Sequence, residues 1–134
     1  MALAQSPSFP AVQSVKQLMV DVIHPSSNDI LLLIYRGGPK DEKDWAAVRR
    51  AAATLAESGN MLATRGRAPS QGDAQGDWMK DAKLLTDAGN AAYKAAQAKD
   101  ANALAALAGA LDDSCTACHK QYRPNVFPHE GASK

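Results

Sequence analysis

The chain has 134 residues, enough for one domain with a buried core but too few for two independent domains. Its formal net charge of +1 gives no reason to expect nucleic acid or an acidic membrane as a partner. Hydrophobic residues make up 46% of the chain, aromatic residues only 5%, and alanine is common, which favours close-packed helices over a sheet sandwich.

The N-terminal residues 1–10 hold two prolines among small polar residues and are predicted to form a loose lead-in. Ala2-Leu3-Ala4 followed by Gln5 matches the small-residue end of a secretory signal, although a random alanine-rich start gives the same pattern. No apolar run approaches the roughly 18 residues that a membrane span requires. We therefore expect an exported chain whose signal peptide is removed, and no membrane span.

A first helix is predicted directly after this lead-in. Its apolar residues recur at helical spacing and form one stripe, made of Val12, Val15, Leu18, Met19, Val22 and Ile23. Pro25 interrupts the pattern, and His24, as the residue before a proline, is expected to leave helical geometry. Because Ser26 and Ser27 offer caps for a restart, the first helix is predicted to be kinked or broken near Pro25.

Two more helices are predicted in the middle of the chain. Asp41 is the expected N-cap of the second helix, which ends at Gly59 or about one turn later. A long loop over residues 64–76 leads to the third helix, which starts near Asp77. Gly89 inside that helix costs about 1 kcal/mol relative to alanine, and we attribute its presence to close helix packing.

The fourth helix is predicted to begin after Asp100 and to end at Pro124, followed by a C-terminal tail, residues 125–134. Its apolar positions step by three and four residues and include both cysteines: Leu104, Leu107, Ala108, Leu111, Cys115 and Cys118. Four amphipathic helices with mostly short connections predict an all-α fold, an antiparallel four-helix bundle over residues 11–124. Bundles of this kind hold cofactors between facing helices.

Cys115, Cys118 and His119 form a Cys-x-x-Cys-His motif on the fourth helix. This spacing is the attachment signature of a c-type haem, in which both thiols form thioether bonds to the porphyrin and the histidine binds the iron. On a helix, Cys115 and His119 share a face, and Cys118 stands one turn from Cys115. We therefore expect one covalently attached haem c.

A Cys-x-x-Cys pair also occurs in redox dithiols, in zinc sites and as a disulfide. A dithiol would need a strand–helix context that the flanking sequence lacks, and a disulfide would close a very tight loop for which helical flanks are unsuitable. A zinc site would need distant ligands, because His24 and His129 are the only other histidines and no second cysteine pair exists. The histidine directly after the second cysteine favours haem.

A haem motif on the last of four helices, followed by Lys-Gln-Tyr-Arg at residues 120–123, resembles the cytochrome c′ family, the class II c-type cytochromes. The resemblance covers the layout of the whole bundle, but it is residue-specific only at this motif and loosely at Lys16-Gln17. It implies a haem-bearing four-helix bundle of the bacterial periplasm, often a homodimer. In relatives, an arginine four residues after the haem histidine lies near the proximal face, and Arg123 matches that position.

The same resemblance raises the question of the sixth iron ligand. Five-coordinate relatives close that face with an apolar side chain and bind gases, whereas low-spin relatives supply a methionine from the first helix. At 100° per residue, Met19 lies near the middle of the apolar stripe and Leu18 at its edge, so we expect Met19 to bind the iron, with core packing as its alternative role. The alternative is bis-histidine coordination by His24, which would bind iron more strongly than a thioether but lies 140° around the wheel from Met19 and before a proline. Met61 and Met79 lie near a loop and a helix start and are weaker candidates.

Two functions of different classes follow from these predictions. The first is a periplasmic one-electron carrier, in which His119 and Met19 hold the haem iron and redox partner proteins supply and accept the electron. The second is a five-coordinate protein that binds nitric oxide or carbon monoxide, with its distal side closed by Leu18 or by a displaceable Met19. We do not expect an enzyme, because no acid–base or nucleophile set accompanies the haem motif.

Overall fold

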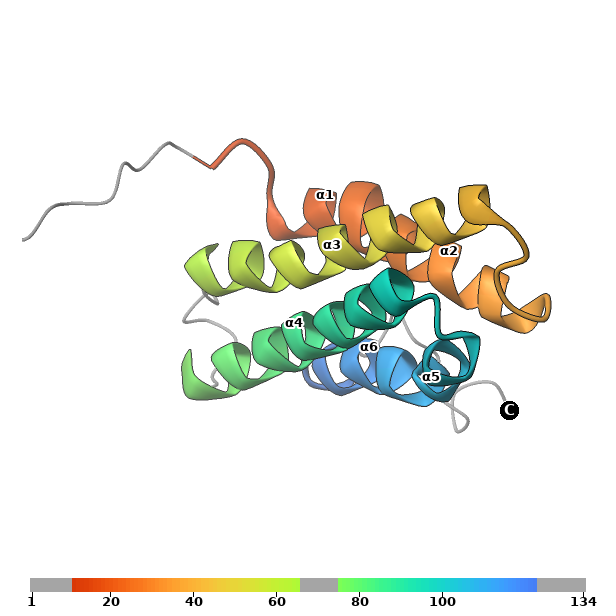
Figure 1. Ribbon diagram of the computed structural model, residues 1–134. Helices are drawn as coiled ribbons and strands as arrows, with labels where there is room; N and C mark the ends of the chain where they lie inside the picture. The colour runs from red at the N-terminus through yellow and green to blue at the C-terminus, as the bar shows by residue number, and fades with distance from the viewer. Residues whose placement is uncertain (1–10, 66–74, 123–134) are drawn as a thin grey trace, which may run out of the picture.

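The computed structural model describes residues 11–65 and 75–122. Within these ranges the chain forms four helical segments and no strand, an all-helical fold compatible with a helical bundle. Consecutive segments run in opposite directions, as the colour gradient in Figure 1 shows. The predicted lead-in, His129, the C-terminal tail and Arg123, the residue matched to the proximal arginine, lie outside the described residues.

The first helical segment is continuous but irregular, because it contains α1 (Val15–Leu18), the π-helical turn η1 (Met19–Ile23) and α2 (His24–Tyr35). A capping box starts it. The backbone N–H of Gln17 donates to Ser14 Oγ at 3.1 Å, and the Ser14 N–H donates to Gln17 Oε1 at 2.8 Å. The predicted first helix is therefore present, with a widened turn in its middle.

Pro25 lies in the first turn of α2, directly after this π turn. The expectation that His24 leaves helical geometry is wrong, because its φ of −60° and ψ of −48° are helical. No side-chain cap restarts the helix either. A proline lacks the N–H of an α-helical bond, and its ring crowds the carbonyl four residues earlier, so a wider turn just before it lets the helix continue. A kink at this point stays a prediction.

The second and third predicted helices correspond to α3 (Glu42–Arg65) and α4 (Gln75–Ala98). The Asp44 N–H donates to Asp41 Oδ1 at 2.8 Å, which confirms Asp41 as the cap that starts α3. The helix continues beyond the predicted end, to Arg65. α3 packs against α2 on one side and α4 on the other (Figure 1).

Two glycines bring α3 and α4 close together. A Cβ added at Gly59 would lie 2.6 Å from the Ala82 carbonyl oxygen, and one added at Gly89 would lie 2.9 Å from the Ala56 Cα. Neither position can hold a larger side chain without moving a backbone. The attribution of Gly89 to close packing is therefore confirmed.

The predicted fourth helix is divided into α5 (Ala101–Ala106) and α6 (Ala108–Tyr122) at Leu107, whose ψ of −5° departs from α-helical geometry. Asp100 caps α5, accepting a hydrogen bond from the Ala103 N–H at 3.0 Å. α6 packs on α4 and touches α2 (Figure 1), which puts the motif helix beside the first helical segment.

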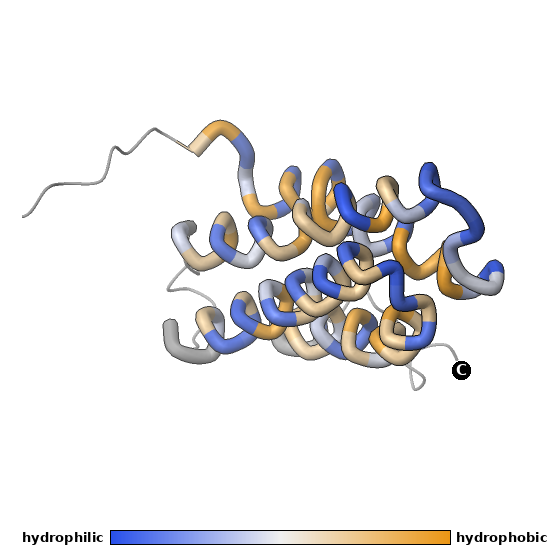
Figure 2. The backbone as a smooth tube through the Cα atoms, in the orientation of Figure 1, coloured by the Kyte–Doolittle hydropathy of each residue, from blue (hydrophilic) through white to orange (hydrophobic). Residues whose placement is uncertain are grey.

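The helices are amphipathic around one core. Figure 2 shows hydrophobic and hydrophilic residues alternating along each helix. The largest fully buried apolar side chains come from the first helical segment, α3, α5 and α6: Ile23, Ile30, Val48, Leu55, Leu104 and Leu111. α4 adds the smaller, fully buried Ala92 and Ala96. Among the described helices, none combines the length and apolar character that crossing a membrane would need.

Candidate functional site

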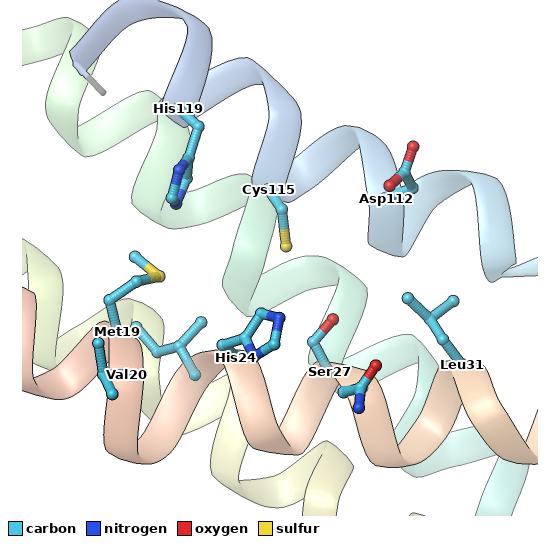
Figure 3. A pocket seen from close by; sticks show the side chains of 10 residues that line it. Met19, Val20, His24, Ser27, Leu31, Asp112, Cys115 and His119 are labelled. Carbon is cyan, nitrogen blue, oxygen red and sulfur yellow. The ribbon is translucent and has the colours of Figure 1, made fainter. Parts of the chain in front are cut away.

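A cavity of about 400 Å³ separates α6 from the first helical segment (Figure 3). Pockets for small molecules and cofactors commonly have volumes of about 300–1,000 Å³. On α6 the cavity is lined by Asp112, Cys115 and His119. The first helical segment supplies the opposite wall, made of Met19, Val20, Ile23, His24, Ser27, Asn28 and Leu31. The helix with the cysteine–histidine motif thus faces the helix with the predicted distal ligand.

Met19 and His119 lie opposite each other across this cavity. Figure 3 shows the Met19 thioether and the His119 imidazole directed toward one another, with the Cys115 Sγ pointing into the same space. Met19 is half-buried, and His119 is only 6% exposed. Met19 therefore faces inward, as the helical wheel predicted, and the motif histidine His119 lies opposite it.

A second, smaller cavity adjoins the first and reaches the remaining cysteine. It shares Met19, Ile23, Cys115 and His119 with the larger cavity. Its other lining residues come from α3, α4 and α6, namely Leu62, Asp81, Leu85, Ser114 and Cys118. All three motif residues and Met19 therefore border one connected region of the bundle interior.

Both cysteines are half-buried, and they are not joined in a disulfide. Burial raises the pKa of the Cys115 thiol, because desolvation penalises the thiolate, and the charge of Asp112 acts in the same direction. The nearby hydroxyls of Ser114 and Ser27 partly oppose that rise. Cys115 is thus held as a neutral thiol beside the cavity, with no partner sulfur bound to it.

The other predicted site residues lie elsewhere. Leu18 is 4% exposed in the core and lines neither cavity. Met61 packs against the core, and Met79 is 44% exposed, so neither borders the region between Met19 and His119. Of the residues considered for the distal side, Met19 and His24 reach the cavity, and Leu18, Met61 and Met79 do not.

Sequence reasoning wrongly placed one polar residue, His24, away from the cavities and missed another, Asp81, which also borders them. His24 lines the larger one, on the same wall as Met19. Asp81 lines the smaller one and is only 8% exposed. The signal for Asp81 was its place on the apolar side of α4, three residues after Trp78 and four before Leu85, where a carboxylate interrupts the stripe. The signal for His24 was Pro25, because a proline within a helix changes the rotation per residue in the turn before it.

Fold and site together define an all-helical protein with a cavity between facing helices, bordered by the Met19 thioether, the Cys115 thiol and the imidazoles of His24 and His119. Cys118 borders the smaller cavity beside it. In the described part of the chain, no group of three or more His, Cys, Asp or Glu side chains is arranged to hold a metal ion. Comparisons with protein-family models, with curated protein sequences and with solved structures find no match to this chain.

Proposed function

We propose that this chain is a c-type cytochrome of the cytochrome c′ type that carries one electron in the periplasm. One haem c would be attached through Cys115 and Cys118, with its iron between His119 and Met19. The observation that carries the proposal is the opposition of Met19 and His119 across a cavity that Cys115 also borders (Figure 3). A six-coordinate haem iron would be held by one donor from each wall of the cavity, and His119 and Met19 are the two side chains that would supply them.

The residues present fit a covalently attached haem. The two cysteines are not joined in a disulfide, lie one helical turn apart and border neighbouring cavities, so both would reach one edge of a porphyrin. The cavity walls carry apolar side chains, among them Val20, Ile23 and Leu31, which suit the apolar body of the macrocycle. When bound, the haem supplies a one-electron couple between ferric and ferrous iron.

The protein side chains would control that couple. Met19 lies on η1, which packs on α3, and His119 lies on α6, which packs on α4. Both side chains would therefore be held in place while a bound haem changes its charge, which would keep reorganisation small. A thioether donor favours the ferrous state and raises the reduction potential. The electron would pass to and from redox partner proteins of the periplasm.

The alternative function is a five-coordinate protein that binds nitric oxide or carbon monoxide. It requires a distal face closed by a residue that does not hold the iron. Of the two residues predicted for that face, Leu18 lies in the core away from both cavities, whereas Met19 borders both. The placement of Leu18 argues against the form of this alternative in which Leu18 closes the distal face. The form with a displaceable Met19 is separated from the carrier by the spectra below.

Absorption spectra of the purified ferric protein test the proposal. We expect a low-spin spectrum with the weak near-infrared sulfur-to-iron band, which Met19→Ala abolishes. Met79→Ala is the matched control, because Met79 is exposed outside both cavities, and it should keep the band. A high-spin ferric spectrum that Met19→Ala leaves unchanged would contradict the carrier function.

Haem attachment needs its own test. Cys115→Ala combined with Cys118→Ala should abolish covalent binding, seen as loss of the haem mass and of haem staining after denaturing electrophoresis. Each single substitution should leave attachment through one thioether. Haem that stays covalently bound in the double variant would remove the basis of the proposal.

A further inference from the structure

The π turn changes which residues share a face with Met19. In an α-helix, His24 would point away from Met19, since five residues carry it 140° past a full turn at 100° per residue. In the structure, the His24 backbone N–H donates to the Met19 carbonyl oxygen, the i→i+5 bond of a π-helix. That bond stacks His24 one turn above Met19, and both side chains line the same cavity.

Figure 3 shows the consequence for the site. The His24 imidazole stands on the wall opposite α6, between Met19 and Ser27, and faces the space below Cys115. Its side chain is exposed, so it is not held in the core packing. The distal wall therefore presents two donors of different chemistry, a thioether and an imidazole, one helical turn apart.

We propose that His24 is a second distal iron ligand, which takes the sixth position when Met19 is absent or displaced. The proposal rests on the proposed function, since it needs a haem held by His119. Two side chains one turn apart on a helix face can reach a single metal atom, as histidines four residues apart on an α-helix do in zinc enzymes. The π turn makes the five-residue separation of Met19 and His24 equivalent to one turn. Imidazole is itself a common axial ligand of haem iron, so His24 has the required chemistry.

Only one distal position is open on the iron, so Met19 and His24 compete for it. Met19 has the advantage of position, because it lies directly opposite His119 (Figure 3). His24 has the advantage of donor strength toward ferric iron, for which a nitrogen donor is preferred over a soft thioether. Loss of the thioether should therefore leave a six-coordinate ferric haem with two imidazoles, instead of an open site.

Four forms of the haem-loaded protein test this ligand exchange by ferric absorption and electron paramagnetic resonance: wild type, Met19→Ala, His24→Ala and the double variant. His24→Ala should keep the near-infrared sulfur band. Met19→Ala should lose that band but stay low-spin, with the resonance pattern of two imidazoles. The double variant should become high-spin. His24 is exposed, so its substitution leaves core packing intact.

The outcomes separate the inference from the proposed function. A wild type with the sulfur band and a high-spin Met19→Ala protein would overturn the inference and leave the carrier function standing. A double variant as low-spin as Met19→Ala would also overturn it, since another group would then be the ligand. A low-spin wild type that lacks the band, and turns high-spin in His24→Ala, would support His24 as ligand and contradict Met19. A wild type without covalent haem would refute the proposed function itself.

Pro25 allows a test of the geometry. Pro25→Ala restores the backbone N–H whose absence favours the wide turn, so η1 should revert to α-helical spacing and carry His24 away from the Met19 face. Met19→Ala combined with Pro25→Ala should then be high-spin, whereas Met19→Ala alone is low-spin. A low-spin spectrum in that combination would show that the π turn does not bring His24 to the iron.

Discussion

Gly89→Ala should destabilise the protein although alanine is the better helix former. The added Cβ would lie 2.9 Å from the Ala56 Cα and closer still to the Ala56 N, so α4 would have to move away from the backbone of α3. Overpacking of this kind costs about 1–3 kcal/mol, and here the neighbour is a helix backbone that cannot rotate aside, which favours the upper end. The gain in helix propensity offsets about 1 kcal/mol. The free energy of unfolding should therefore fall by about 2 kcal/mol.

Urea unfolding followed by circular dichroism measures this change. Gly109→Ala is the matched control, because an added Cβ at Gly109 meets nothing within 4 Å. That substitution should be neutral or stabilise the protein by up to about 1 kcal/mol. If Gly89→Ala were as stable as Gly109→Ala, the close approach of α3 and α4 at this point would be wrong.

Three further predictions concern a buried hydrogen bond and two titrating groups. Trp78→Phe should lower the free energy of unfolding by about 1–3 kcal/mol in urea denaturation, because Trp78 Nε1 donates to the buried Leu62 carbonyl at 2.7 Å. The hydrogen bond and charge of Lys99 lower the pKa of Glu42 below its ordinary 4.5. The stability that this ion pair gives the folded protein is therefore fully present above pH 4.5 and is lost as the pH falls through the lowered pKa. Lys99→Met should return the pKa of Glu42 toward 4.5 in an NMR titration. In protein produced without haem, alkylation of Cys115 should still accelerate above pH 9.0, because burial raises the pKa of its thiol, and a rate that levels off below that pH would contradict this.

The sequence was sufficient for the helices wherever the signal was local. Asp41 and Asp100 cap α3 and α5 as such residues do, because their side chains reach backbone N–H groups three residues later. The break at Leu107 was not predictable in the same way. The apolar spacing continues across Leu107, and a helical wheel uses only that spacing. It therefore cannot detect a change in the backbone angles of a single residue.

The candidate site was likewise predictable where the helix is regular and not where its backbone changes. The thiol and imidazole spacing of the motif is fixed by one regular helix, α6, so the prediction that Cys115 and His119 share a face holds in the structure. Met19 also faces the cavity as expected. The prediction that His24 points away from Met19 was wrong, because a helical wheel assumes the same rotation at every residue and the π turn η1 rotates less.

The π turn matters for the whole distal wall. The lining residues of the first helical segment fall at positions 19, 20, 23, 24, 27, 28 and 31. At a constant 100° per residue they would spread over about 180° of the helix, too wide an arc for one wall of a cavity. A π turn advances less per residue, so it rotates everything after Met19 backwards and narrows that arc. The same local distortion that accommodates Pro25 therefore aligns the two halves of the first helical segment against α6, and His24 reaches the cavity as part of that alignment.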